Sequence, residues 1–121
     1  MKQVLIVDDS EQIRERLVAL LAESTQIRLV GKAGNAREAR DALQRLQPDT
    51  VILDIRLPGS SGIQLLKEIK TSHPKVTVIM LTNFDYAPYR RQCQQLGADH
   101  FLNKTLEFEK IVDTILGNTA H

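Results

Sequence analysis

The amino-acid sequence predicts one α/β domain, in which a doubly wound five-stranded parallel sheet carries helices on both faces. Three observations support this fold class. Five short runs rich in Val, Ile and Leu alternate with segments of helical spacing along the whole chain. The runs are almost continuously apolar, as in parallel strands that are buried on both faces. The length of 121 residues suits a single hydrophobic core.

The five expected strands are short and rich in branched aliphatic residues. They are Gln3–Val7, Arg28–Ala33, Thr50–Leu53, Val76–Leu81 and His100–Asn103. Because parallel strands require crossover connections, we expect the segments between them to be helices that pack on the sheet.

Four of the expected helices have apolar residues at the spacing of one helix face. These stripes are Ile13, Leu17, Leu20 and Leu21; Ala36, Ala39, Leu43 and Leu46; Ile63, Leu66 and Ile69; and Phe108, Ile111, Val112, Ile115 and Leu116. The fourth helix in chain order, about Pro88–Leu96, has the thinnest stripe. Its proline fits only in the first turn, with Asp85 or a neighbour as the cap. Gly97 is expected just past its end.

Composition excludes several classes of protein. Sixteen basic and fifteen acidic residues give a net charge of +1, so we expect no direct binding to nucleic acid or to a membrane surface. The single cysteine, Cys93, excludes an internal disulfide framework and a cysteine-based zinc site. No apolar run is long enough to cross a membrane, and the N-terminus does not resemble a signal peptide. These features predict a soluble cytoplasmic protein.

Polar residues follow four of the predicted strands at the point where each strand ends. Asp8 and Asp9 follow the first strand, Asp54 the third, Thr82 the fourth and Lys104 the fifth. Because ligands of such sheets bind at the carboxyl ends of the strands, we expect these side chains to meet at one edge. Clustered carboxylates raise one another's pKa and need a cation among them. The lysine supplies one positive charge, and Mg²⁺, which prefers oxygen ligands, is the expected second cation.

Each of these residues also has a purely structural interpretation. Asp9 could cap the first helix, and Asp54 could open a turn at Pro58–Gly59. Thr82 could simply end a strand, and Lys104 could be a solvated surface charge. These alternatives explain the residues one at a time, but they do not explain why all of them fall at the same edge of the sheet.

Together the residues resemble a response-regulator receiver domain of the CheY-like type, and the resemblance covers nearly the whole chain. The Asp54, Pro58 and Gly62 spacing is specific in combination with the acidic pair. The matching segments are Val7–Ser10, Leu53–Pro58, Gly62, Leu81–Thr82, Gly97–Asp99 and Phe101–Lys104. The resemblance implies a flavodoxin-like (βα)5 fold with strand order 2-1-3-4-5. It also implies that residues 1–121 form a single receiver domain with no output domain.

The resemblance implies a role in two-component signal transduction. Asp54 is expected to accept a phosphoryl group from a phosphohistidine on a sensor histidine kinase or a histidine phosphotransfer protein. Lys104 and Thr82 are expected to bind the oxygens of the added group. The residues expected to hold Mg²⁺ are Asp8, Asp9, Asp54 and, through its backbone carbonyl, Arg56. Such a chain is not an enzyme in the usual sense, because it catalyses only its own phosphorylation and dephosphorylation.

The same resemblance implies a conformational switch. Thr82 moves toward the phosphoryl group, and Phe101 rotates inward to fill the vacated space. The face formed by the fourth helix, the fifth strand and the fifth helix then changes, and a downstream protein partner recognises it. An ordinary core position is the alternative interpretation of the phenylalanine, and both can hold for one residue.

Four residues depart from the family pattern or crowd the site. Thr105 follows Lys104, where many receivers have proline, and we expect a trans peptide bond there because a cis bond would cost about 3–4 kcal/mol. Asn83 follows the switch threonine, where many relatives have a small residue. Arg56 and Phe84 stand two positions after Asp54 and Thr82 and are expected to affect the lifetime of the phosphoryl group.

The residues argue against two other classes of protein and leave a third open. A phosphatase of the haloacid-dehalogenase type needs a second aspartate at the position of Arg56. A nucleotide-binding domain needs a glycine- or hydroxyl-rich loop where Asp8 and Asp9 stand. The alternative that stays open is a protein-interaction module with the receiver fold that does not take up phosphate, since Thr105 and Asn83 depart from the pattern.

Overall fold

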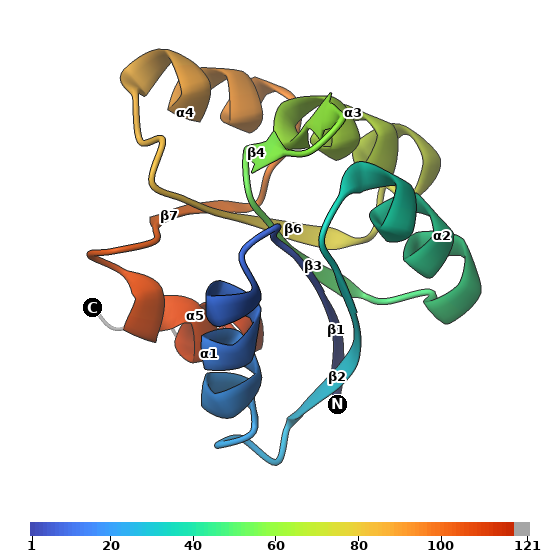
Figure 1. Cartoon of the computed structure of the whole chain (residues 1–121), viewed down its shortest axis with the longest axis vertical. Helices are drawn as coiled ribbons and strands as arrows, with labels where there is room; N and C mark the ends of the chain where they lie inside the picture. Colours follow the sequence, from blue (N-terminus) through green and yellow to red (C-terminus); the bar gives the residue numbers. More distant parts are fainter. Residues whose placement is uncertain (118–121) are drawn as a thin grey trace.

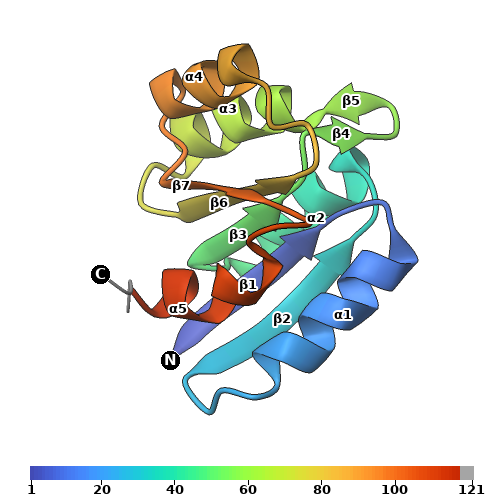
Figure 2. The same cartoon turned by 90° about the vertical axis from the view of Figure 1, so that its left-hand side faces the viewer.

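The computed structural model describes residues 1–117. Its main sheet has five parallel strands in the order β2-β1-β3-β6-β7, which confirms the predicted order when these five strands alone are counted (Figure 2). The strands are β1 (Lys2–Val7), β2 (Ile27–Ala33), β3 (Thr50–Leu53), β6 (Thr77–Thr82) and β7 (His100–Asn103). All four neighbouring pairs are parallel.

Helices cover both faces of this sheet, as the apolar stripes predict (Figure 1). The helices are α1 (Glu11–Leu21), α2 (Ala36–Leu46), α3 (Gly62–Ser72), α4 (Ala87–Gln95), the 3₁₀ turn η1 (Phe108–Lys110) and α5 (Ile111–Leu116). Helices α2, α3 and α4 lie on one face, and α1 and α5 lie on the other.

Side chains of the strands alternate between two hydrophobic cores. Leu5 and Val7 of β1 belong to the core under α2, α3 and α4, whereas Val4 and Ile6 belong to the core under α1 and α5. All four are fully buried. Because a strand that is buried on both faces cannot slide by one residue without exchanging its two sets of contacts, this pattern fixes where each strand ends.

A two-stranded hairpin that was not predicted lies between β3 and α3. Strands β4 (Arg56–Leu57) and β5 (Ser60–Ser61) pair antiparallel around the predicted turn at Pro58–Gly59. Gly59 has a φ of 76°, a conformation that glycine adopts without steric cost. The hairpin returns the chain to the end of β3, so that α3 begins beside Asp54.

Two of the predicted helix boundaries need correction. The residue before α4 is Tyr86, whose side chain makes no capping hydrogen bond, and the Asp85 carboxylate binds Arg90 instead, at 2.7 Å. Phe108 lies in the 3₁₀ turn η1 and not in the last α-helix. Gly97 is confirmed as the residue past the end of α4, with a φ of 97°.

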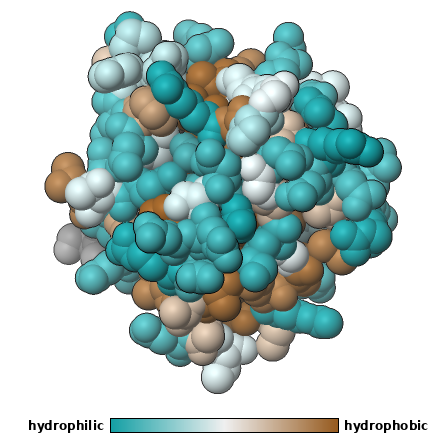
Figure 3. Space-filling view, viewed as in Figure 1, coloured by the Kyte–Doolittle hydropathy of each residue, from teal (hydrophilic) through white to brown (hydrophobic). Residues whose placement is uncertain are grey.

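Polar residues cover most of the face seen in Figure 3. The large hydrophobic side chains that are most exposed within residues 1–117 are Met1, Tyr86 and Leu106. In the same part of the chain, no helix is both long enough and apolar enough to cross a membrane.

Candidate functional site

Three carboxylates meet at the carboxyl edge of the sheet, as the sequence predicts. Asp8 and Asp9 follow β1, and Asp54 follows β3. One oxygen of each carboxylate lies within 4.8 Å of one oxygen of each of the others. Asp8 and Asp54 are buried, whereas Asp9 is exposed. Solvent therefore reaches the cluster at Asp9.

Lys104, which follows β7, reaches into this cluster. Its Nζ lies 2.7 Å from Asp8 Oδ2 and 2.8 Å from Asp54 Oδ2. Lys104 is only 9% exposed, so the interpretation as a solvated surface charge is wrong. Three negative charges face one positive charge, and the excess is negative.

Neighbouring groups hold Asp8 in place. Its Oδ1 accepts a hydrogen bond from Ser10 N at 2.8 Å, and its backbone carbonyl accepts one from the Arg14 guanidinium at 2.7 Å. The cap of α1 is Ser10, whose hydroxyl accepts a hydrogen bond from Ile13 N. Asp9 is therefore not the helix cap, and its carboxylate is free of that structural role.

The position of Asp54 depends on a close backbone approach at Gly62. Gly62 N donates to the carbonyl of Ile55 at 2.6 Å, and a Cβ on Gly62 would lie 1.8 Å from the carbonyl oxygen of Asp54. Only glycine fits there, which explains the Asp54 to Gly62 spacing physically. The carboxylate of Asp54 also accepts a hydrogen bond from Ile55 N at 2.7 Å.

Burial and pairing act on the charges in opposite directions. Burial raises the pKa of the Asp8 carboxyl above its usual value, although hydrogen bonds from Lys104 and Ser10 N act the other way. Burial alone would lower the pKa of Lys104, but its bonds to Asp54 and Asp8 outweigh that effect and raise the pKa. The ammonium is thus charged at neutral pH, while the charge on Asp8 is destabilised.

The donor set fits a hard divalent cation. Carboxylate oxygens grouped this closely repel one another, and one ammonium leaves part of the negative charge uncompensated. Mg²⁺ binds through one or two carboxylates and keeps several waters, which suits a cluster with one exposed member.

The side chain of Arg56 is exposed and lies over the ring of Phe84, with 4.2 Å between Cζ and the ring centre.

Thr82, the last residue of β6, is fully buried next to this cluster. Its carbonyl accepts a hydrogen bond from Lys104 N at 2.9 Å, which joins the ends of β6 and β7. Its hydroxyl accepts one from Phe84 N at 3.1 Å. The hydroxyl is therefore engaged within its own loop.

Phe101 lies away from the carboxylates, on the side of the sheet that α4 covers. It is half-buried, and the guanidinium of Arg90 stacks over its ring with 4.5 Å between Cζ and the ring centre. Arg90 also binds Asp85 and lies 3.4 Å from the carbonyl of Phe101. Arg90 is thus a structural contact of Phe101, the switch candidate.

Sequence reasoning missed two features of the site. The first is Arg14, whose signal was weak because a basic residue in the first turns of a surface helix is common. The second is a hydrogen bond from Thr105 Oγ1 to Asn83 Oδ1 at 2.9 Å, between two residues that were singled out separately. Residues 1–117 contain no cis peptide bond, so the predicted trans bond between Lys104 and Thr105 is confirmed.

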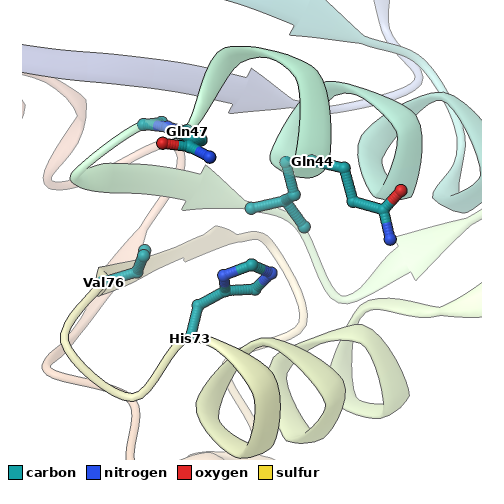
Figure 4. A pocket seen from close by; sticks show the side chains of 6 residues that line it. Gln44, Gln47, His73 and Val76 are labelled. Carbon is teal, nitrogen blue, oxygen red and sulfur yellow. The ribbon is translucent and has the colours of Figure 1, made fainter.

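A pocket of about 430 Å³ lies at the opposite edge of the sheet, between the ends of α2 and α3 (Figure 4). His73, Gln44 and Gln47 line it beside Val76. None of the predicted site residues takes part in it. We therefore place the candidate site at the acidic cluster.

The chain belongs to the response regulator receiver domain family, because residues 4–116 match that family. Receiver domains of this family are components of two-component systems. The transcriptional regulatory protein LnrK of Bacillus subtilis (strain 168) is 34% identical over 121 residues, which are 100% of this chain and 54% of LnrK. The chain therefore spans about half of that relative.

Protein CcdB of the same strain is also 34% identical over 121 residues, which are 100% of both chains. Among solved structures, the crystal structure of the CheX–CheY–BeF3–Mg²⁺ complex from Borrelia burgdorferi contains a similar chain. Its TM-score is 0.89 at 25% identity, and the match covers 99% of this chain and 90% of that one. These similarities agree with the flavodoxin-like fold.

Proposed function

We propose that Asp54 accepts a phosphoryl group from a phosphohistidine on a sensor histidine kinase or a histidine phosphotransfer protein. The observation that carries this proposal is the convergence of three carboxylates and one buried lysine at a single sheet edge. Asp54 and Asp8 are both held by Lys104 and by a backbone amide. Asp54 is the proposed acceptor because its spacing to Pro58 and Gly62 is that of the receiver pattern.

In the proposed step, a carboxylate oxygen of Asp54 attacks the phosphorus atom and the bond from phosphorus to the imidazole nitrogen breaks. The imidazole leaves and takes up a proton. Such transfers depend mainly on positioning and on neutralised charge. When bound by Asp8, Asp9, Asp54 and the Arg56 carbonyl, Mg²⁺ would neutralise charge on the transferred group.

Lys104 and Thr82 then bind the oxygens of the added group. Lys104 already lies 2.8 Å from the acceptor carboxylate, so it can follow the new charge with little movement. The hydroxyl of Thr82 has a proton to donate to an added oxygen, but turning toward Asp54 takes it away from Phe84 N, whose hydrogen bond it accepts. The added group carries a charge of about −1.5 to −2, which favours this exchange of partners.

The output follows from the space that Thr82 vacates beside β6. As Thr82 moves, Phe101 rotates inward and leaves the Arg90 guanidinium that stacks on it. The face formed by α4, β7 and α5 changes, and a downstream protein partner binds it. The crystallised complex of CheX with CheY, BeF3 and Mg²⁺ supports a protein partner as a precedent among similar chains.

Beryllofluoride, which mimics a phosphoryl group on a carboxylate, tests the proposal directly. With Mg²⁺ present, we expect beryllofluoride to shift the backbone amide NMR signals of residues 54–56, 82–84 and 101–105. Asp54→Asn, which keeps the size of the side chain, should show no such shifts. A wild-type protein that does not respond, while a control receiver does, would favour the phosphate-independent interaction module.

A further inference from the structure

A side-chain hydrogen bond joins two exposed polar residues, each of which directly follows a predicted site residue in the sequence. Asn83 follows β6, Thr105 follows Lys104, and the Thr105 hydroxyl donates to Asn83 Oδ1 at 2.9 Å. One residue earlier, Lys104 N donates to the carbonyl of Thr82 at 2.9 Å. The side-chain bond therefore extends the pairing of β6 and β7 one step beyond the sheet.

The Thr105 side of this bond is held firmly by its own loop. Asn103 Oδ1 accepts hydrogen bonds from Thr105 N and Leu106 N, both at 2.9 Å. The backbone of Asn103 is held in turn, because its N donates to Glu107 Oε1 at 2.9 Å. The backbone of Thr105 is thus held in place independently of the hydrogen bond that its hydroxyl donates to Asn83.

The Asn83 side is held by fewer contacts. In the described part of the chain, the other hydrogen bonds found for residues 83–86 stay within the loop and α4. They are those from Phe84 N to the hydroxyl of Thr82, from Arg90 to Asp85 and from Arg90 N to the Tyr86 carbonyl. The bond to Thr105 is therefore the side-chain hydrogen bond that ties this loop to the neighbouring one.

We propose that Asn83 and Thr105 are positioning residues whose mutual hydrogen bond holds the β6–α4 loop in its unphosphorylated conformation. This inference rests on the proposed function of Asp54. Movement of the Thr82 hydroxyl toward a phosphoryl group breaks its bond to Phe84 N, and the intervening Asn83 is drawn away from the fixed Thr105. The hydrogen bond between Asn83 and Thr105 thus opposes the conformational change of the β6–α4 loop.

The size of the effect follows from the strength of one solvent-exposed hydrogen bond. Loss of such a bond changes an equilibrium by about two- to tenfold. Removing it from either side should shift the loop toward the phosphoryl-bound conformation by that factor.

Thr105→Val and Thr105→Ser form a matched pair, because valine keeps the shape of threonine without the hydroxyl and serine keeps the hydroxyl. In the protein without ligand, Thr105→Val should speed amide hydrogen exchange at Phe84 by about two- to tenfold. Thr105→Ser should match the wild type. Equal exchange rates in Thr105→Val and the wild type would overturn the inference.

Binding of beryllofluoride with Mg²⁺ then tests the link to Asp54. Thr105→Val and Asn83→Ala should each tighten binding by about two- to tenfold, and the double variant should bind no more tightly than either single variant. If the effects of the two substitutions on beryllofluoride affinity add in the double variant, the two residues do not act through one shared hydrogen bond, and the inference is overturned. If no variant binds beryllofluoride although exchange at Phe84 changes as expected, the proposed function fails while the restraint on the loop stands.

Discussion

The ammonium of Lys104 lies 2.8 Å from the Asp54 carboxylate, although 50 positions separate the two residues in the sequence. The same ammonium lies 2.7 Å from Asp8. Both carboxylates are buried, so this lysine is a cation that pairs with two acidic groups out of water. The two buried carboxylates of the candidate site are therefore assembled around Lys104.

Replacing this lysine should destabilise the protein strongly. Lys104→Met removes the charge and leaves Asp8 and Asp54 buried without it, so the free energy of unfolding should fall by about 3 kcal/mol in the absence of Mg²⁺. Added Mg²⁺ should restore part of the loss. Urea unfolding of both proteins, with EDTA and with Mg²⁺, measures this. If Lys104→Met is as stable as the wild type in EDTA, Lys104 does not compensate the two buried carboxylates.

The pH dependence of stability should reveal the destabilised charge on Asp8. Its pKa is raised in the folded protein because the group is buried. Its contribution to stability is therefore fully present below pH 3.8 and is lost as the pH rises through the folded pKa. We expect Asp8→Asn to be more stable than the wild type at pH 7 without Mg²⁺, and the gain should shrink toward acidic pH. Urea unfolding of Asp8→Asn and of the wild type, between acidic pH and pH 7, measures this difference in stability.

Gly62 should be far less tolerant of substitution than Gly59. Gly62→Ala forces a methyl group against the Asp54 carbonyl, so it should cost about 3 kcal/mol. Gly59→Ala meets no atom within 4 Å and should cost only about 1 kcal/mol for its positive φ. Thermal or urea unfolding compares the two. Equal losses would show that the approach at Asp54 is not tight.

Cys93 should be almost inert in the folded protein. It is fully buried in α4, and burial raises the pKa of its thiol to about 11. From the usual 9.0, this shift lowers the thiolate fraction at pH 8 by about a hundredfold. Labelling with a disulfide reagent should be slow in buffer and fast in urea. Labelling at the rate of a free thiol in buffer would contradict the burial.

The sequence was sufficient for the sheet and for most of the site because of one geometric rule. Asp8, Asp54 and Lys104 each follow a run of buried apolar residues, and parallel strands bring their carboxyl ends to a single edge. A predicted strand end thus becomes a predicted position in space. Helices α1, α2 and α3 followed equally well from their apolar stripes.

Contacts between exposed polar residues could not be predicted in this way. The Asn83 and Thr105 side chains are 22 positions apart and belong to no periodic pattern, so their hydrogen bond depends on loop geometry. Arg90 pairs with Asp85 across the start of α4, which removed the predicted cap from that role. Contacts of this kind form between side chains that only the folded chain brings together.

Phosphorylation of Asp54 tests the central claim most directly. Incubation with a small phosphodonor and Mg²⁺, followed by intact-protein mass spectrometry, should add one phosphoryl group to the wild type. Asp54→Asn and a wild-type sample in EDTA should gain none. A wild-type protein that stays unmodified, under conditions that label a control receiver, would contradict the account, as would equal labelling of Asp54→Asn.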